Sequence, residues 1–96
     1  MIDIADFRSW LENLHPGYII GFSCDPYRCP VANHIFEVVA PGRTTTVTWV
    51  GYTIGDDAYD TPTWAKKFIR LTDSLGRNKS ITASMALNIL NEVAPA

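Results

Sequence analysis

The stretch from residue 44 to residue 55, TTTVTWVGYTIG, decides the fold class of this chain. It is rich in β-branched and aromatic residues and alternates between apolar and polar side chains over part of its length, which is typical of a β-strand. Gly51 marks either a bulge or a turn that divides the stretch into two strands. Because the longer segments on both sides have helical signals, this strand region predicts an α+β fold.

Four segments around this stretch have the three- and four-residue apolar spacing or the start and stop signals of helices. The predicted helices cover residues 3–14, 30–40, 62–75 and 83–93. Between them, the sequence predicts a buried strand over 18–22, a loop over 56–62 and a short extended piece over 77–81. We therefore expect one compact domain over residues 1–96, with about four helices packed on a small antiparallel sheet of two to three strands. The side chains expected to be buried are Leu11, Ile20, Ile35, Phe36, Phe68, Ile69, Leu87 and Leu90.

The composition is that of a globular protein of 96 residues, with 47% apolar and 19% charged residues. The first residues are acidic where a secretory signal would be basic, and no apolar run approaches the ~20 residues that span a bilayer. Two cysteines are too few for a disulfide-stapled secreted scaffold. We therefore expect a cytoplasmic protein that does not associate with a membrane.

The charges are unevenly distributed along the chain. Residues 1–63 hold three Arg against eight Asp or Glu, and residues 64–96 hold five Lys or Arg against two acids, so the two parts carry −5 and +3. A nucleic-acid-binding protein normally has a larger basic surface than this. The sequence does not favour a nucleic-acid partner, and we expect the basic residues to lie on a solvated helix face. They are Lys66, Lys67, Arg70, Arg77 and Lys79.

The stretch 21–36, GFSCDPYRCPVANHIF, holds both cysteines and one of the two histidines. Cys29 is predicted at the N-cap of a helix whose first residue is Pro30, where free backbone N–H groups and the helix dipole lower a thiol pKa. Cys29 is thus a candidate redox residue, with Cys24 as its resolving thiol. The alternative, which the sequence favours, is a small buried hydrophobe. A zinc site would use Cys24, Cys29 and His34, but zinc requires four ligands, and we expect no metal or other cofactor.

The other polar residues match no catalytic motif. The acidic stretch 56–60 lacks the alternating Asp spacing and the final Glu of a calcium loop. Aromatic residues are favoured interface anchors, so we expect them to bind a partner together with this acidic stretch. The expected binding residues are Tyr27, Trp49, Tyr52, Asp56, Asp57, Tyr59 and Asp60.

Four short segments of the chain carry a resemblance to known proteins. They are Trp10-Leu11, C-P-V-A at 29–32, P-x-W-A-x-x-F-I at 62–69 and I-T-A-x-x-A-L-x-I-L at 81–90. In their spacing the chain resembles a group of short uncharacterised bacterial proteins. That group has no assigned activity, so the resemblance supports the segmentation and implies no function.

From these observations we expect a small non-enzymatic protein-interaction or regulatory module. One specific form of such a module is an inhibitor of a host complex, made by a phage or mobile element. We expect its partner to be another protein. The alternative is a thiol-dependent redox protein that uses Cys29 and Cys24. The sequence leaves the oligomeric state open.

Overall fold

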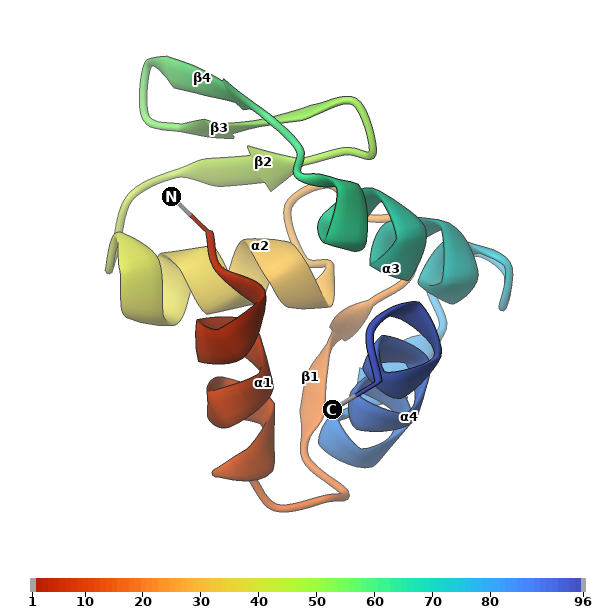
Figure 1. The fold of residues 1–96 in the computed structure, drawn as a ribbon. Helices are drawn as coiled ribbons and strands as arrows, with labels where there is room; N and C mark the ends of the chain where they lie inside the picture. Colours follow the sequence, from red (N-terminus) through yellow and green to blue (C-terminus); the bar gives the residue numbers. More distant parts are fainter. Residues whose placement is uncertain (1, 96) are drawn as a thin grey trace.

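The computed structural model, shown as a ribbon in Figure 1, describes residues 2–95. The helices are α1 (Ile4–Glu12), α2 (Pro30–His34), α3 (Thr63–Asp73) and α4 (Ala83–Val93), and a π-helix over Ile35–Val39 continues α2. The strands are β1 (Ile19–Phe22), β2 (Thr45–Val47), β3 (Gly51–Ile54), β4 (Asp57–Asp60) and β5 (Ser80–Thr82). The predicted α+β class is therefore confirmed.

The strands form two antiparallel sheets, where the sequence suggested one. β1 pairs with β5, and β2, β3 and β4 form a meander in sequence order. In Figure 1 the three-stranded sheet lies along one side of the molecule with α2 beneath it and α3 beside its end, whereas β1 runs between α1 and α4. The turn at residues 48–50, just before Gly51, separates β2 from β3, as the sequence allowed.

Residues 57–60 form an edge strand, so the predicted loop over 56–62 is wrong for these four residues. A two-residue turn at Gly55 and Asp56, with Gly55 at φ +58°, reverses the chain and places Asp57 opposite Ile54. Aspartate is poorly represented in strands, which is why the composition of this stretch predicts a loop. The tight turn and the pairing with β3 override that preference.

Three helices, α1, α2 and α4, begin at residues that satisfy or remove free backbone donors. The Asp3 side chain accepts a hydrogen bond from the Ala5 N–H at 3.1 Å, and the Thr82 hydroxyl accepts one from the Met85 N–H at 3.2 Å. α2 has Cys29 at its N-cap and a proline at its first position, as predicted. These caps fix where the chain enters each helix and therefore which face it buries.

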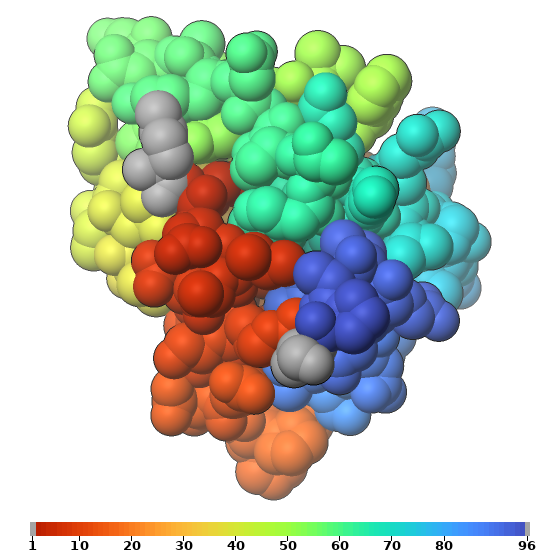
Figure 2. Space-filling view, in the orientation of Figure 1, coloured from red at the N-terminus to blue at the C-terminus, as the bar shows by residue number. Residues whose placement is uncertain are grey.

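The core lies where the helices meet the two sheets. In Figure 2, α1, α3 and α4 pack side by side on the face shown. Most of the predicted core side chains are buried, and Leu87 is half-buried against the core. The buried ones are Leu11, Ile20, Ile35, Phe68, Ile69 and Leu90.

Phe36 was expected in the core, but 47% of its surface is exposed. The reason is the π-helix, in which the Ala40 N–H donates to the Ile35 carbonyl, five residues earlier. The wider turn changes the angular spacing of the side chains, and Ile35 is the one buried residue of the π-helix. Val38 and Val39 are exposed as well. This helical segment, although rich in apolar residues, is therefore not buried on all sides.

The helices described between residues 2 and 95 are all too short or too polar to cross a bilayer.

Candidate functional site

A groove of about 310 Å³ lies between the 24–29 turn, the β2–β3 turn and α3. We call it the Trp49 groove. Its floor is made of buried apolar side chains, its rim is exposed, and two half-buried carboxyl groups line it. The floor residues are Cys29, Val47 and Ile69, the rim residues are Cys24, Pro26, Thr48 and Trp49, and the carboxyl groups belong to Asp25 and Asp73.

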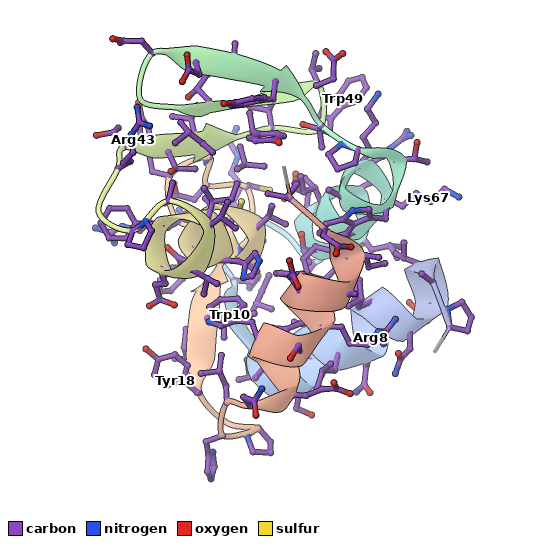
Figure 3. All side chains as sticks on the ribbon, turned by 60° about the vertical axis from the view of Figure 1, so that its left-hand side comes forward. Arg8, Trp10, Tyr18, Arg43, Trp49 and Lys67 are labelled. Atoms are coloured by element: carbon purple, nitrogen blue, oxygen red, sulfur yellow. The ribbon has the colours of Figure 1, made fainter. Side chains whose placement is uncertain are left out.

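The β2–β3 turn holds Trp49 at the rim. Thr48 closes the turn, because its N–H and its hydroxyl both donate to the Gly51 carbonyl, at 2.9 and 3.0 Å. The Thr61 hydroxyl, from the segment before α3, donates to the Thr48 carbonyl at 2.7 Å. The Arg70 guanidinium on α3 lies 5.9 Å from the centre of the Trp49 ring, within cation–π distance. Figure 3 shows Trp49 at this corner of the molecule, beside α3.

The 24–29 turn forms the opposite wall. One carboxylate oxygen of Asp25 accepts hydrogen bonds from the N–H groups of Tyr27 and Arg28, at 3.0 and 3.2 Å, which is an Asx turn. The Pro26 carbonyl accepts a hydrogen bond from the Val47 N–H at 2.8 Å. This bond joins the turn to the outer edge of β2, so the two walls are held at a fixed separation.

Cys24 connects the same turn to α3. Its φ is +58°, an uncommon value for a residue other than glycine, and its N–H donates to an Asp73 carboxylate oxygen at 2.9 Å. At the base of the turn, β1 passes so close to the backbone that residue 21 has no room for a side chain. A Cβ on Gly21 would lie 2.4 Å from the Arg28 carbonyl oxygen and 2.8 Å from the Pro30 nitrogen.

Both thiols are free, and neither has the lowered pKa of a reactive cysteine. Burial raises the pKa of Cys29 to about 11, and the N–H groups of Ala32 and Val31 offset only part of this effect. Desolvation and the neighbouring Asp73 carboxylate also raise the pKa of Cys24, which is exposed. At Cys29 burial affects the pKa more than the helix end does, so the lowered pKa expected from the sequence does not occur.

The structure separates the predicted binding residues. Trp49 lines the groove, and Tyr27, which is 63% exposed, is next to the rim residue Pro26. Tyr52 was expected on a binding surface, but it is buried on the core side of β3. Asp56 and Asp57 lie at the β3–β4 turn, at the other end of the sheet from Trp49 (Figure 1).

A second cavity, of about 300 Å³, lies beside the edge strand β4. We call it the edge cavity. Tyr59 and Asp60, both predicted binding residues, line it together with Tyr52, and the Tyr52 and Tyr59 rings are stacked with their centres 5.0 Å apart. Ile2 and Pro62 complete its lining.

His34 is fully buried. Its ring packs against Phe7 and Trp10, with ring centres 5.3 and 5.0 Å apart, and neither ring nitrogen has a hydrogen-bond partner among residues 2–95. Burial lowers the pKa of His34, and the Asp6 carboxylate opposes this shift. The same residues contain no group of three or more His, Cys, Asp or Glu side chains placed to hold a metal ion.

Sequence reasoning did not find Asp25, Val47, Ile69 or Asp73 as parts of a site. The D-P pair at 25–26 was recognised as a turn signal, but nothing in the sequence relates that turn to residues 47, 69 and 73. The hydrogen bonds from Val47 to Pro26 and from Cys24 to Asp73 connect these segments in the folded chain.

Comparison with protein-family models, with curated proteins and with solved structures found no match to this chain. The choice of the Trp49 groove as the candidate site therefore rests on geometry. The resemblance to short bacterial proteins stays a prediction.

Proposed function

We propose that the protein is a small non-enzymatic interaction module that regulates a partner protein by holding one of its segments in the Trp49 groove. The observation that supports this most is Trp49 itself. Its side chain is 54% exposed at the rim of a groove with an apolar floor, although a large apolar ring is normally buried. Tryptophan beside such a groove is a frequent centre of binding energy in protein interfaces.

The chemistry of the groove suggests the kind of segment that it binds. Its buried floor accepts an apolar side chain, while Asp25 and Asp73 attract a basic one beside it. Tyr27 and Val50, both well exposed, extend the apolar surface beyond the rim. We therefore propose a partner segment that carries an aliphatic or aromatic residue next to Lys or Arg.

The thiol-dependent alternative has weaker support. A redox or nucleophilic cysteine needs a thiolate that is accessible near neutral pH, and Cys29 is buried with a pKa of about 11. Cys24 is accessible, but its pKa is raised as well. Both side chains serve more readily as part of the groove wall than as a reactive pair.

The cytoplasm is the proposed location, because both cysteines are free thiols. An inhibitor that a phage or mobile element directs at a host complex is the narrower form of the proposal. Such a protein acts by occupying a surface and needs no catalytic group.

The test is a comparison of two aromatic-to-alanine variants. Trp49→Ala removes the proposed anchor, and Tyr18→Ala removes an aromatic ring that is 51% exposed at the far end of the molecule (Figure 3). Each variant and the unchanged protein are used as bait in extract of the producing cells, and retained proteins are identified by mass spectrometry. Direct binding of the purified candidate is then measured by calorimetry.

We expect one partner to bind the unchanged protein and Tyr18→Ala alike, and to bind Trp49→Ala about 30-fold more weakly, as for a typical interface hot spot. Equal affinity for Trp49→Ala would disprove the role of the groove. Recovery of no protein partner by any bait would count against the interaction module as a whole.

A further inference from the structure

The outer edge of β4 has backbone groups available for hydrogen bonding. In an antiparallel ladder, alternate residues direct their N–H and C=O groups to opposite sides of the strand. The Thr61 N–H donates to the Val50 carbonyl, and Asp57 and Tyr59, which alternate with Thr61, also face β3. The backbone groups of Ala58 and Asp60 therefore point away from the sheet. Within the described residues 2–95, they form no hydrogen bond with another residue.

The edge cavity continues this edge on the core side of the sheet. Tyr59 lies on the same face as the buried Tyr52, whose ring it stacks on, and is itself half-buried. A strand added next to β4 would place the residue opposite Tyr59 on this face, beside the edge cavity. A cavity of about 300 Å³ has room for one apolar side chain of such a strand.

We propose that the outer edge of β4 binds an extended, basic segment of a partner protein as an additional antiparallel strand. Ala58 and Asp60 supply the backbone hydrogen bonds, and the edge cavity receives one apolar side chain. The Asp57 and Asp60 side chains are exposed on opposite faces of β4 and attract lysine or arginine on each side of that apolar residue. This is the strand-addition form of peptide recognition, in which the backbone provides affinity and pockets provide specificity.

The same two carboxylates argue against a second copy of this chain as the occupant. Two copies paired edge to edge would bring Asp57 and Asp60 of both chains into one short ladder, and like charges across strands destabilise such a ladder. Acidic residues on an edge are in fact a common protection against self-pairing. A basic strand removes the repulsion, so the edge selects its partner by charge.

The probe is a blocked synthetic peptide with the central sequence Lys-Val-Thr-Lys flanked by threonines. Paired antiparallel to β4, it places valine opposite Tyr59 and the two lysines opposite Asp57 and Asp60. One control peptide has glutamate in place of both lysines. A second control keeps both lysines but carries N-methyl groups on the residues that would donate to β4, so it keeps the charge and loses the backbone bonds.

Binding is measured by titration of the full chain, with NMR shifts and amide exchange at Ala58 and Asp60 as the local signal. We expect the basic peptide to bind, to slow exchange of these two amides, and to weaken as salt is added. We expect the glutamate and N-methylated peptides to bind at least tenfold more weakly. Asp57→Asn combined with Asp60→Asn should weaken binding about fivefold, as for two exposed ion pairs.

Ala58→Pro is the decisive variant. The backbone N–H of residue 58, which proline lacks, faces away from β3, and an edge strand tolerates proline at such a position. Ala58→Thr keeps this N–H and is the matched control. We expect Ala58→Thr to bind the peptide and folded Ala58→Pro to lose it. If Ala58→Pro does not fold, the N-methylated peptide still tests the backbone bonds.

Three results of the peptide titrations would overturn the proposal. They are equal binding of the N-methylated peptide, full binding by folded Ala58→Pro, and no binding of the basic peptide at low salt. Sedimentation showing a dimer that Ala58→Pro dissociates would also overturn it, since a second copy would then occupy the edge. Trp49→Ala should leave peptide binding unchanged, so failure here is distinguishable from failure of the Trp49 groove.

Discussion

His34 is a buried histidine whose two ring nitrogens have no hydrogen-bond partner in the described chain, residues 2–95. Burial lowers its pKa below the ordinary value of 6.5, so the folded protein resists its protonation. Above pH 6.5 His34 is neutral in both the folded and the unfolded chain, so its protonation does not reduce the free energy of unfolding. As the pH falls below 6.5, only the unfolded chain takes up the proton, and the free energy of unfolding decreases by at most about 1.4 kcal/mol per pH unit.

We therefore expect urea denaturation midpoints to fall from pH 7 to pH 5, and to fall less in His34→Leu, which cannot be protonated. His15→Asn is the matched control, because His15 is exposed and asparagine still offers an acceptor to the Gly17 N–H. The slope of His34→Leu is compared with the slope of this variant, which keeps His34. An identical slope in His34→Leu would show that the acid sensitivity comes from other groups.

The two cysteines should differ in their reaction with iodoacetamide. Cys24 is exposed and Cys29 is buried, so Cys29→Ser, which keeps only Cys24, should be labelled in the folded state. Cys24→Ser, which keeps only Cys29, should be labelled at the rate of unfolding. Both rates are followed by mass spectrometry at neutral pH, with and without denaturant. Cys29→Ser should cost ~1 kcal/mol of stability, because it buries a hydroxyl.

Rapid labelling of Cys29 in the folded protein would contradict its burial and would favour the thiol-dependent alternative. A disulfide between Cys24 and Cys29 under mild oxidant would favour it further, since the resolving thiol would then be within reach.

At the scale of elements, β1 depends on having no side chain at Gly21. A Cβ there would lie 2.4 Å from the Arg28 carbonyl oxygen and 2.8 Å from the Pro30 nitrogen, and backbone atoms do not yield as a flexible side chain does. We expect Gly21→Ala to lower the free energy of unfolding by about 3 kcal/mol, at the upper end of overpacking effects. Because the 24–29 turn must move, Cys29 should also become easier to label.

Gly17→Ala is the control for this substitution. A Cβ on Gly17 would meet only the His15 side chain, at 3.4 Å, so urea denaturation should show a change below about 0.5 kcal/mol. Equal stability of the two alanine variants would mean that β1 is not in close contact with the turn.

The helices were predictable because periodic apolar residues and capping residues are local signals. α4 has Thr82 as its N-cap and covers residues 83–93, as predicted. α1 has the predicted apolar face, although it ends earlier than expected. The π-helix and β4 were not predictable in the same way. A π-helix differs from an α-helix by one hydrogen-bond step, which Phe36 and its neighbours do not reveal, and β4 depends on its pairing with β3.

At the scale of the whole molecule, the sequence pointed to side chains of the candidate site but not to the groove that they border. Trp49 and Tyr27 were among the aromatic residues expected to bind a partner, and both are exposed. Their relation to α3 depends on contacts between residues far apart in the chain, such as Cys24 with Asp73. Tyr52 was misjudged because alternation along a strand does not say which face a sheet buries until its partners are known.

The pairing of β1 with β5 has a consequence for how the chain is made. Phe22 lies opposite Ser80, so at ~5–20 residues per second a ribosome needs about three to twelve seconds to supply the partner strand after β1 has been synthesised. The β2–β3–β4 meander pairs only close neighbours in sequence and can form during that interval. A nascent chain thus holds an apolar strand without its partner for several seconds.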